Sequence, residues 1–244
     1  MNVFFVILLS VPASMESPLD GWFLDAEAGM AFSNYNDVRI PGDSGTEFSL
    51  TEDFETDPAI AVRLRIGRTL GERHHVSLFA APLRFEAGGA AGEDISYNGT
   101  VFPAGTDISA SYRFDSYRFT YRYDLVRNGR LTAAAGFTVK VRDAAIHLEG
   151  GGLESTKSNT GLVPLVSFSL DWAATGKLHL LLDGDALAAP QGRAEDVFLG
   201  AGWAFDPGTV LRAGYRILEG GADNDEVYNF TMVSFAALGF SLAL

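Results

Sequence analysis

The stretch Tyr112–Leu125, which reads YRFDSYRFTYRYDL, sets the interpretation of the whole chain. From Tyr117 onward every second residue is aromatic, and Arg118, Thr120 and Arg122 stand between the rings. Alternation with a period of two predicts a β-strand with one aromatic face and one polar, cationic face. An unbroken run of large aromatic side chains suits a transmembrane strand, with the rings toward lipid and the arginines toward the lumen of a barrel.

The composition limits the alternatives. With 244 residues, 47% apolar and 20% charged, the chain fits one domain, and its mean hydropathy is only +0.11. No run of eighteen apolar residues occurs, which excludes a membrane protein built from helices. The net charge of −13 disfavours nucleic-acid binding. No phosphate-binding loop, zinc-ligand spacing or nucleophile elbow is present, so we expect no cofactor.

The N-terminal residues predict a secretory signal. The apolar run Val3–Leu9 is followed by the small-residue segment Ser10–Ser14, as in the hydrophobic region and cleavage zone of a signal peptide. No Lys or Arg precedes the run, which departs from that pattern. We predict a signal peptide over residues 1–16 and a single barrel domain over residues 17–244. The alternative is that the apolar run is an ordinary buried strand or short helix.

The alternation of the opening stretch recurs along the chain. Pro82 interrupts one repeat, where proline requires either a β-bulge or an unpaired position, and the side that carries the apolar residues changes at Asp115-Ser116, where we predict a β-bulge. The repeats predict ten strands, and eight remain possible if one of the predicted strands has been divided wrongly. The ten strands are predicted at residues 22–35, 60–67, 75–85, 107–125, 131–141, 162–172, 178–185, 197–205, 210–218 and 227–244.

The predicted connections alternate between long and tight. The long ones lie at 36–57, 87–105, 148–160, 189–193 and 219–226, and the tight ones at 70–73, 127–130, 173–176 and 206–208. Transmembrane barrels have short turns at one end and longer loops at the other. Trp22, Trp172 and Trp203 all lie beside the tight turns, where an interfacial aromatic girdle is expected. The predicted fold class is therefore all-β, a single antiparallel up-and-down transmembrane β-barrel.

This pattern over about Trp22–Leu244 resembles the small outer-membrane β-barrel proteins of Gram-negative bacteria, among them uncharacterised porin-like members. The resemblance implies a location in the bacterial outer membrane, contact with outer-membrane lipid and assembly by the barrel-assembly machinery. Such proteins usually end in an aromatic residue. Here the final segment Gly239–Leu244 keeps the alternation but ends in Leu.

Charged residues on the predicted inward faces are expected to pair. The interior of a ten-stranded barrel is narrow enough for side chains to fill it, and a buried ion without a partner is costly. Asp25 and Asp171 also fall on inward faces. The alternative is a narrow, charge-lined pore or small-ligand channel. The predicted lumen-lining charge network comprises Glu27, Arg63, Arg65, Arg118, Arg122, Lys140, Arg142, Asp183, Asp185, Arg212 and Arg216.

Two sets of residues suggest hydrolase chemistry. Asp183, Asp185 and His179 resemble the water-activating groups of omptin-like proteases, but all three lie on one predicted strand. His147, Glu149 and Ser155 could form a set like that of a lipid A deacylase, but residues this close in sequence need not face one another. We therefore expect no enzyme, and a structural or surface-interaction role instead.

Two further alternatives remain. The acidic run Asp223–Glu226 could supply oxygen ligands to a divalent cation, but its spacing does not match an EF-hand loop, so no metal site is expected. A soluble, calycin-like barrel that binds an apolar ligand would need the aromatic faces turned inward. The loops contain no recognisable motif, so the sequence leaves any extracellular partner unknown.

Overall fold

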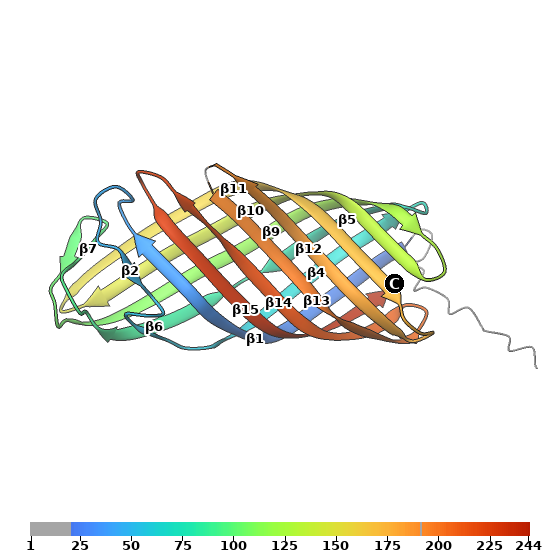
Figure 1. Ribbon diagram of the computed structural model, residues 1–244, viewed down its shortest axis with the longest axis horizontal. Coiled ribbons are helices and arrows are strands. Elements are labelled where there is room, and N and C mark those ends of the chain that lie inside the picture. Colours follow the sequence, from blue (N-terminus) through green and yellow to red (C-terminus); the bar gives the residue numbers. More distant parts are fainter. Residues whose placement is uncertain (1–20, 191) are drawn as a thin grey trace, which may run out of the picture.

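The computed structural model describes residues 21–190 and 192–244, and the predicted signal peptide over residues 1–16 lies outside them. Ten strands close into an antiparallel barrel, which confirms the predicted fold class and strand number (Figure 1). The ring closes where β10 pairs with β9. In order around the ring, its members are β1 (Gly21–Arg39), β4 (Ala59–Leu70), β5 (His74–Ala81) with β6 (Arg84–Ala90), β9 (Asp107–Arg127), β10 (Leu131–Gly150), β11 (Leu153–Ala173), β12 (Leu178–Ala189), β13 (Gly192–Asp206), β14 (Thr209–Asp223) and β15 (Tyr228–Ala243).

One barrel strand is divided at Pro82. Both β5 and β6 pair with β9, on either side of an interruption at Pro82 and Leu83. The interruption spans equal lengths of both strands, so Pro82 occupies an unpaired position, which is the second of the two predicted alternatives, and no bulge is present there. Proline cannot donate to the ladder, which accounts for the break at this position.

The two ends of the barrel differ. At one end, here called the turn end, tight turns connect β4 to β5, β9 to β10, β11 to β12 and β13 to β14. At the other, the loop end, the segments after β1 and β6 contain the short strands β2 (Phe48–Ser49), β3 (Glu55–Thr56), β7 (Ile95–Tyr97) and β8 (Thr100–Phe102). The described residues contain no helix of the length and apolarity that crossing a membrane requires.

Three predicted loops at the loop end are largely strand. The segment 148–160 belongs to a continuous hairpin in which β10 and β11 pair from Leu131↔Trp172 to Gly150↔Leu153. Its turn uses Gly151 and Gly152, whose positive φ angles of 61° and 79° favour glycine. Most of the predicted loop at 189–193 is strand, because β12 extends to Ala189 and β13 begins at Gly192, and β14 continues to Asp223 through most of the loop predicted at 219–226.

The apolar face of the long strands changes sides along their length. On β9, Tyr117 and Phe119 are exposed, with Arg118 buried between them. Closer to the loop end, Tyr112 and Ile108 face inward and are 2% and 1% exposed. The ladder with β10 has no register shift at Asp115-Ser116, so the predicted bulge is wrong. The strand stays regular, and only the face that carries apolar side chains changes.

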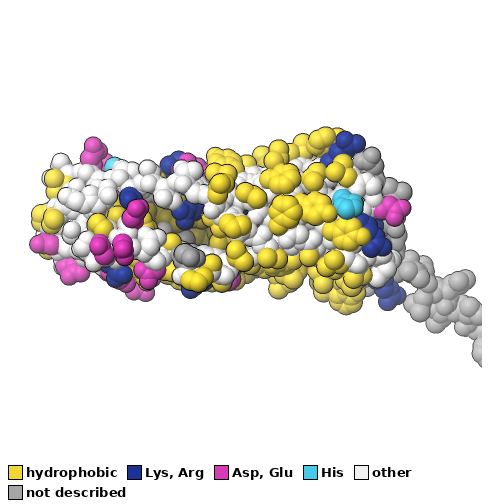
Figure 2. All heavy atoms as spheres, turned by 90° about the horizontal axis from the view of Figure 1, so that it is seen from above, with side chains coloured by type: hydrophobic (Ala, Val, Ile, Leu, Met, Phe, Trp, Pro, Cys, Tyr) yellow, Lys and Arg dark blue, Asp and Glu magenta, His cyan; other side chains and the backbone are white. Residues whose placement is uncertain are grey.

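The outer surface follows the same division. Exposed apolar side chains form a belt around the barrel near the turn end, and polar and charged side chains cover the loop end (Figure 2). Trp22, Trp172 and Trp203 are all exposed at the turn-end edge of this belt. Beyond the belt, the barrel interior holds a buried apolar cluster, to which the segments before β4 and before β9 contribute Phe48, Phe54, Tyr97 and Phe102.

Candidate functional site

A network of charged side chains fills the lumen at the level of the apolar belt. Each strand places the charged residue inward because its neighbours in the sequence are apolar and face outward. Arg118, for example, lies between Tyr117 and Phe119 and is 5% exposed. Four carboxylates and four guanidinium groups form one connected set, contributed by Asp25, Glu27, Arg63, Arg118, Asp185, Asp196, Arg212 and Arg216.

Asp196 on β13 is the centre of this network. Its carboxylate accepts hydrogen bonds from Arg63 on β4, Arg118 on β9 and Arg216 on β14, the last at 2.7 Å. Strands β4 and β9 are not neighbours of β13 in the sheet, so these ion pairs cross the lumen. Arg118 also donates to Asp185 on β12 at 2.8 Å, and Thr138 donates to the other oxygen of that carboxylate.

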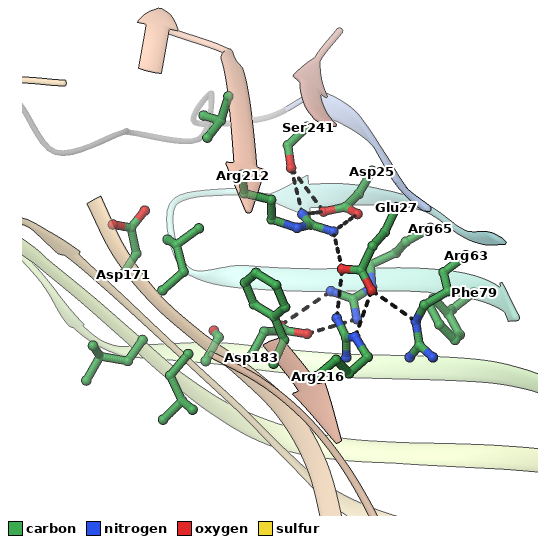
Figure 3. A pocket seen from close by; sticks show the side chains of 16 residues that line it. Asp25, Glu27, Arg63, Arg65, Phe79, Asp171, Asp183, Arg212, Arg216 and Ser241 are labelled. Atoms are coloured by element: carbon green, nitrogen blue, oxygen red, sulfur yellow. Dashed lines mark hydrogen bonds and ion pairs between the residues drawn. The ribbon is translucent and has the colours of Figure 1, made fainter. Parts of the chain in front are cut away.

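Glu27 connects the centre of the network to its turn-end side (Figure 3). It accepts two hydrogen bonds from Arg216, at 2.7 and 3.0 Å, and lies 3.4 Å from Arg63. Arg212 donates to Glu27 at 3.1 Å and to Asp25 at 2.6 Å. Because each charge has a partner of opposite sign, the cost of removing these ions from water is compensated within the lumen.

A second, smaller group lies beside the first. Asp183 on β12 accepts hydrogen bonds from Arg65, at 3.3 Å, and from Arg122. Arg122 also donates to the Ser167 hydroxyl at 2.8 Å.

Two inward aromatic rings pack against guanidinium groups of the first network. Arg118 lies 4.8 Å from the ring centroid of Phe79, and Arg216 lies 5.3 Å from that of Phe198.

The network separates two larger chambers. A cavity of about 150 Å³ remains among Asp25, Glu27, Arg65 and Asp183. Toward the turn end lies a chamber of about 280 Å³, and toward the loop end one of about 530 Å³. The two large chambers share no lining residue, and neither is lined by Glu27 or Asp196. The ion pairs of these two carboxylates lie between the chambers.

Solved structures of bacterial outer-membrane proteins match nearly the whole chain. Outer membrane protease OmpT from Escherichia coli is 9% identical, with 95% of this chain and 100% of that chain covered and a TM-score of 0.57. Neisserial surface protein A is 14% identical (92% and 97% covered, TM-score 0.36), and Ail of Yersinia pestis 10% (92% and 99% covered, TM-score 0.41). No protein-family model and no curated protein sequence matches the chain.

The likeness to OmpT is one of fold, and the surface of the molecule agrees with it. A closed barrel satisfies every strand edge, and its exposed belt of apolar side chains requires lipid around it. The chain has the fold of the bacterial outer-membrane β-barrel proteins, and its belt lies in that membrane. The soluble, calycin-like alternative is wrong, because the aromatic residues Tyr117 and Phe119 face outward. Short turns face the periplasm in such barrels, so the turn end is periplasmic and the loop end extracellular.

The outer-membrane barrel brings nine of the eleven predicted network residues together. Lys140 and Arg142 also face inward, but they lie on the wall of the extracellular chamber and form no ion pair with any described residue. Asp196, which binds arginines from three different strands, is absent from the predicted network because the strand is predicted to begin at Val197. Asp196 immediately precedes Val197 and falls on the same face as Phe198 and Gly200. Extending the alternation by this one residue would have placed Asp196 in the lumen.

Neither hydrolase-like set is assembled in the barrel as the chemistry requires. Asp183 and Asp185 are both held by arginines, and His179 binds Asp171 at 2.6 Å, away from either. Ser155 is 8% exposed and faces inward, whereas the next residue, Thr156, pairs with His147 across the hairpin and hydrogen-bonds to it on the outer face. The described residues include no group of three or more His, Asp or Glu able to hold a metal ion.

Proposed function

We propose that this protein is a non-conducting and non-enzymatic outer-membrane barrel with a structural or surface-interaction role. The observation that supports this proposal is the ion-pair network centred on Asp196. It crosses the lumen between non-adjacent strands and leaves a remaining cavity of only about 150 Å³. A permeant ion would have to displace paired charges whose separation is strongly unfavourable.

The long strands support the surface part of the proposal. A strand of about 9–11 residues crosses the bilayer, whereas β9 and β11 each have 21 residues and β10 has 20. The additional residues extend the barrel beyond the belt, into an end with its own buried apolar core and a polar outside. Such an extension presents a rigid surface outside the membrane, which is what recognition of another molecule requires.

Conductance in planar lipid bilayers tests the sealed lumen. The full-length protein should insert without conductance steps. A variant that combines Arg118→Ala with Asp196→Ala removes both partners of a central ion pair and should produce small steps. The matched control, Arg130→Ala with Asp206→Ala, changes the same residue types at periplasmic turns and should remain silent. Regular steps from the unaltered protein would overturn the sealed lumen and favour the narrow-pore alternative.

The non-enzymatic part has its own test. Purified protein in lipid should neither cleave peptide substrates nor deacylate lipid A. His179→Ala, Asp183→Ala and His147→Ala identify the residues responsible if activity is found. Turnover that is lost in one of these variants, and retained in the Asp206→Ala control, would contradict the proposal.

A further inference from the structure

The wall of the barrel has a gap beside β11. β10 and β11 pair along their whole length, to Gly150↔Leu153. β11 and β12, in contrast, pair only from Ala173↔His179 to Val166↔Ala186. The edge of β11 over residues 153–165 therefore has no paired strand on its β12 side, although the side chain of Asn98 donates to the backbone oxygen of Thr156.

The extracellular chamber opens through this gap. Its volume of about 530 Å³ lies in the range of about 300–1,000 Å³ that is typical of small-molecule sites. Its lining combines inward residues of β10 and β14 with residues of the free edge of β11, so it reaches from the lumen to the outside. Figure 2 shows a hollow in the surface between the apolar belt and the extracellular end, with cationic side chains in its depth.

The mouth of the chamber is apolar and begins within the lipid-facing belt. Leu162 and Pro164 are on the outer face of β11, and Leu162 is 73% exposed. The last pair between β11 and β12 is at Val166, and the belt continues on β11 through Pro164 to Leu162. The periplasmic side of the opening therefore lies within the belt and faces the outer leaflet. Leu187 of β12 lines the other side. Pro164 is tolerated here because a free edge does not need every backbone N–H.

The inner wall of the chamber is cationic. Lys140 is 2% exposed, and its Nζ lies 4.7 Å from the ring centroid of Phe114. Within residues 21–190 and 192–244, no side chain forms an ion pair or hydrogen bond with this ammonium group. The Nε of Arg142 is buried and likewise has no acceptor there, although another N–H of the same guanidinium donates to Asn159. Lys157 is a third cation on the wall.

The acidic residues of the chamber do not neutralise these cations. Glu219 on β14 is engaged by Arg193, at 2.6 Å, and by the Tyr35 hydroxyl. Glu226 belongs to the turn between β14 and β15 and is exposed. A buried ammonium without a counter-ion is unfavourable, so the chamber is suited to an anion that reaches Lys140 and Arg142.

We propose that the chamber binds an anionic lipid of the outer leaflet, which enters sideways through the gap between β11 and β12. Its charged headgroup lies against Lys140 and Arg142. Its acyl chains remain at the mouth, between Leu162, Pro164 and Leu187. The cations deep in the chamber attract an anion, and the apolar mouth joins the lipid-facing belt. An anionic lipid satisfies both conditions, whereas a soluble anion or a peptide does not. This inference is independent of whether the lumen conducts.

Native mass spectrometry of the full-length protein tests the proposal. The protein is released from nanodiscs of phosphatidylglycerol mixed with phosphatidylcholine, and the retained lipid is identified. We expect one phosphatidylglycerol to remain bound to the wild type. Lys140→Met and Arg142→Gln should each weaken its binding about tenfold or more, because each removes a charge-assisted contact. Lys177→Gln, at an exposed periplasmic turn, is the matched control and should bind as the wild type does.

A second pair of measurements separates binding from folding. In zwitterionic detergent alone, Lys140→Met should unfold at the same temperature as the wild type or higher, because it removes a buried charge that has no partner. Adding phosphatidylglycerol should raise the unfolding temperature of the wild type and not of this variant. Ala144→Phe fills the chamber while it keeps every cation, and it should also lose the lipid.

Each of three results would overturn the proposal. One is equal retention of phosphatidylglycerol by the wild type, Lys140→Met and Ala144→Phe. Another is equal retention of phosphatidylcholine and phosphatidylglycerol by the wild type. A rise in unfolding temperature with inorganic phosphate or glycerol phosphate as large as with the lipid would assign the cations to a soluble anion instead.

Discussion

At the scale of single residues, the lumen depends most on Asp196. Its carboxylate holds arginines from three strands, β4, β9 and β14, and it is 2% exposed. Removing it leaves three buried guanidinium groups with fewer partners, and the loss of one member of a buried ion pair costs about 3–5 kcal/mol.

Asp196→Ala should therefore lower the free energy of unfolding by about 3–5 kcal/mol. Urea titration in lipid vesicles, followed by the gel-mobility difference between folded and unfolded protein, measures the change. Asp206→Ala at the exposed turn between β13 and β14 is the control and should unfold as the wild type does. Equal midpoints for all three proteins would show that the network contributes little to stability.

Glu219 supplies a pH dependence at the extracellular end. The hydrogen bond from Arg193 lowers the pKa of this carboxyl below its ordinary value of 4.5, and Tyr35 adds to the effect. A carboxyl whose pKa is lower in the folded state stabilises that state fully above its ordinary pKa. This stabilisation is lost as the pH falls through the lowered value.

We expect Arg193→Gln to increase amide hydrogen exchange in β14 and β15 near Glu219 at neutral pH. The difference from the wild type should disappear at a pH well below 4.5, where the carboxylate is protonated in both proteins. Arg130→Gln, at a periplasmic turn, provides the control. A difference of the same size at both pH values would show that Arg193 acts through packing and not through this ion pair.

At the same scale, the sequence predicts much of the network and only part of its geometry. Alternation alone places Arg63, Arg118 and Arg216 inward, because each stands between outward apolar residues. It does not give the partner of any of them, since partners come from strands far apart in the chain. The absence of a counter-ion for Lys140 depends on those same long-range positions and is equally invisible in the sequence.

At the scale of the strand, the difficult segments are those beyond the belt. The alternation of apolar and polar residues predicts ten strands, but it predicts a loop over residues 148–160. Both faces of that part of β11 are polar, with Ser155 and Asn159 inward and Thr156 and Ser158 outward, so it lacks the signal of a strand. Its partner β10, whose inward residues include Ile146 and Leu148, keeps it in place.

Because the outer face of β11 is apolar within the belt and polar beyond it, the same substitution should affect stability differently at the two levels. Val166 and Ser158 are both exposed on the outer side of β11, but Val166 belongs to the belt and Ser158 lies beyond it. Val166→Arg should lower the free energy of unfolding in lipid vesicles by about 2–4 kcal/mol, because arginine must enter the hydrocarbon region.

Ser158→Arg is the matched control and should change that free energy by less than about 1 kcal/mol, because this position is surrounded by water. Equilibrium urea titration in phosphatidylcholine vesicles measures both variants. Equal costs for the two substitutions would place the edge of the membrane elsewhere than at Leu162.

At the scale of the whole molecule, the belt, the charge-filled lumen and the extracellular core form one barrel with two environments. Near the periplasmic end the outside is apolar and the inside charged, and near the extracellular end the outside is polar and the inside apolar. The gap beside β11 lies where the two meet. Strand count and closure were predictable from periodicity, whereas the gap follows from unequal hairpin lengths that the sequence did not reveal.

The location of the protein follows from this arrangement and can be checked directly. The protein should remain with the membrane pellet after a high-salt wash and dissolve in detergent, and the unboiled form should migrate faster on a gel than the boiled form. Recovery in the soluble fraction, with one mobility before and after boiling, would contradict a lipid-facing belt.

The change of face also determines how deep the molecule sits in the membrane. On three adjacent strands, Tyr117, Val141 and Leu162 form one row of cross-strand neighbours, and Asp115, Asp143 and Thr160 form the next outward row. Sinking by one such step would draw carboxylates into hydrocarbon, and rising by one would expose rings to water. The barrel therefore has a single preferred height, which holds its gap at the level of the lipid headgroups.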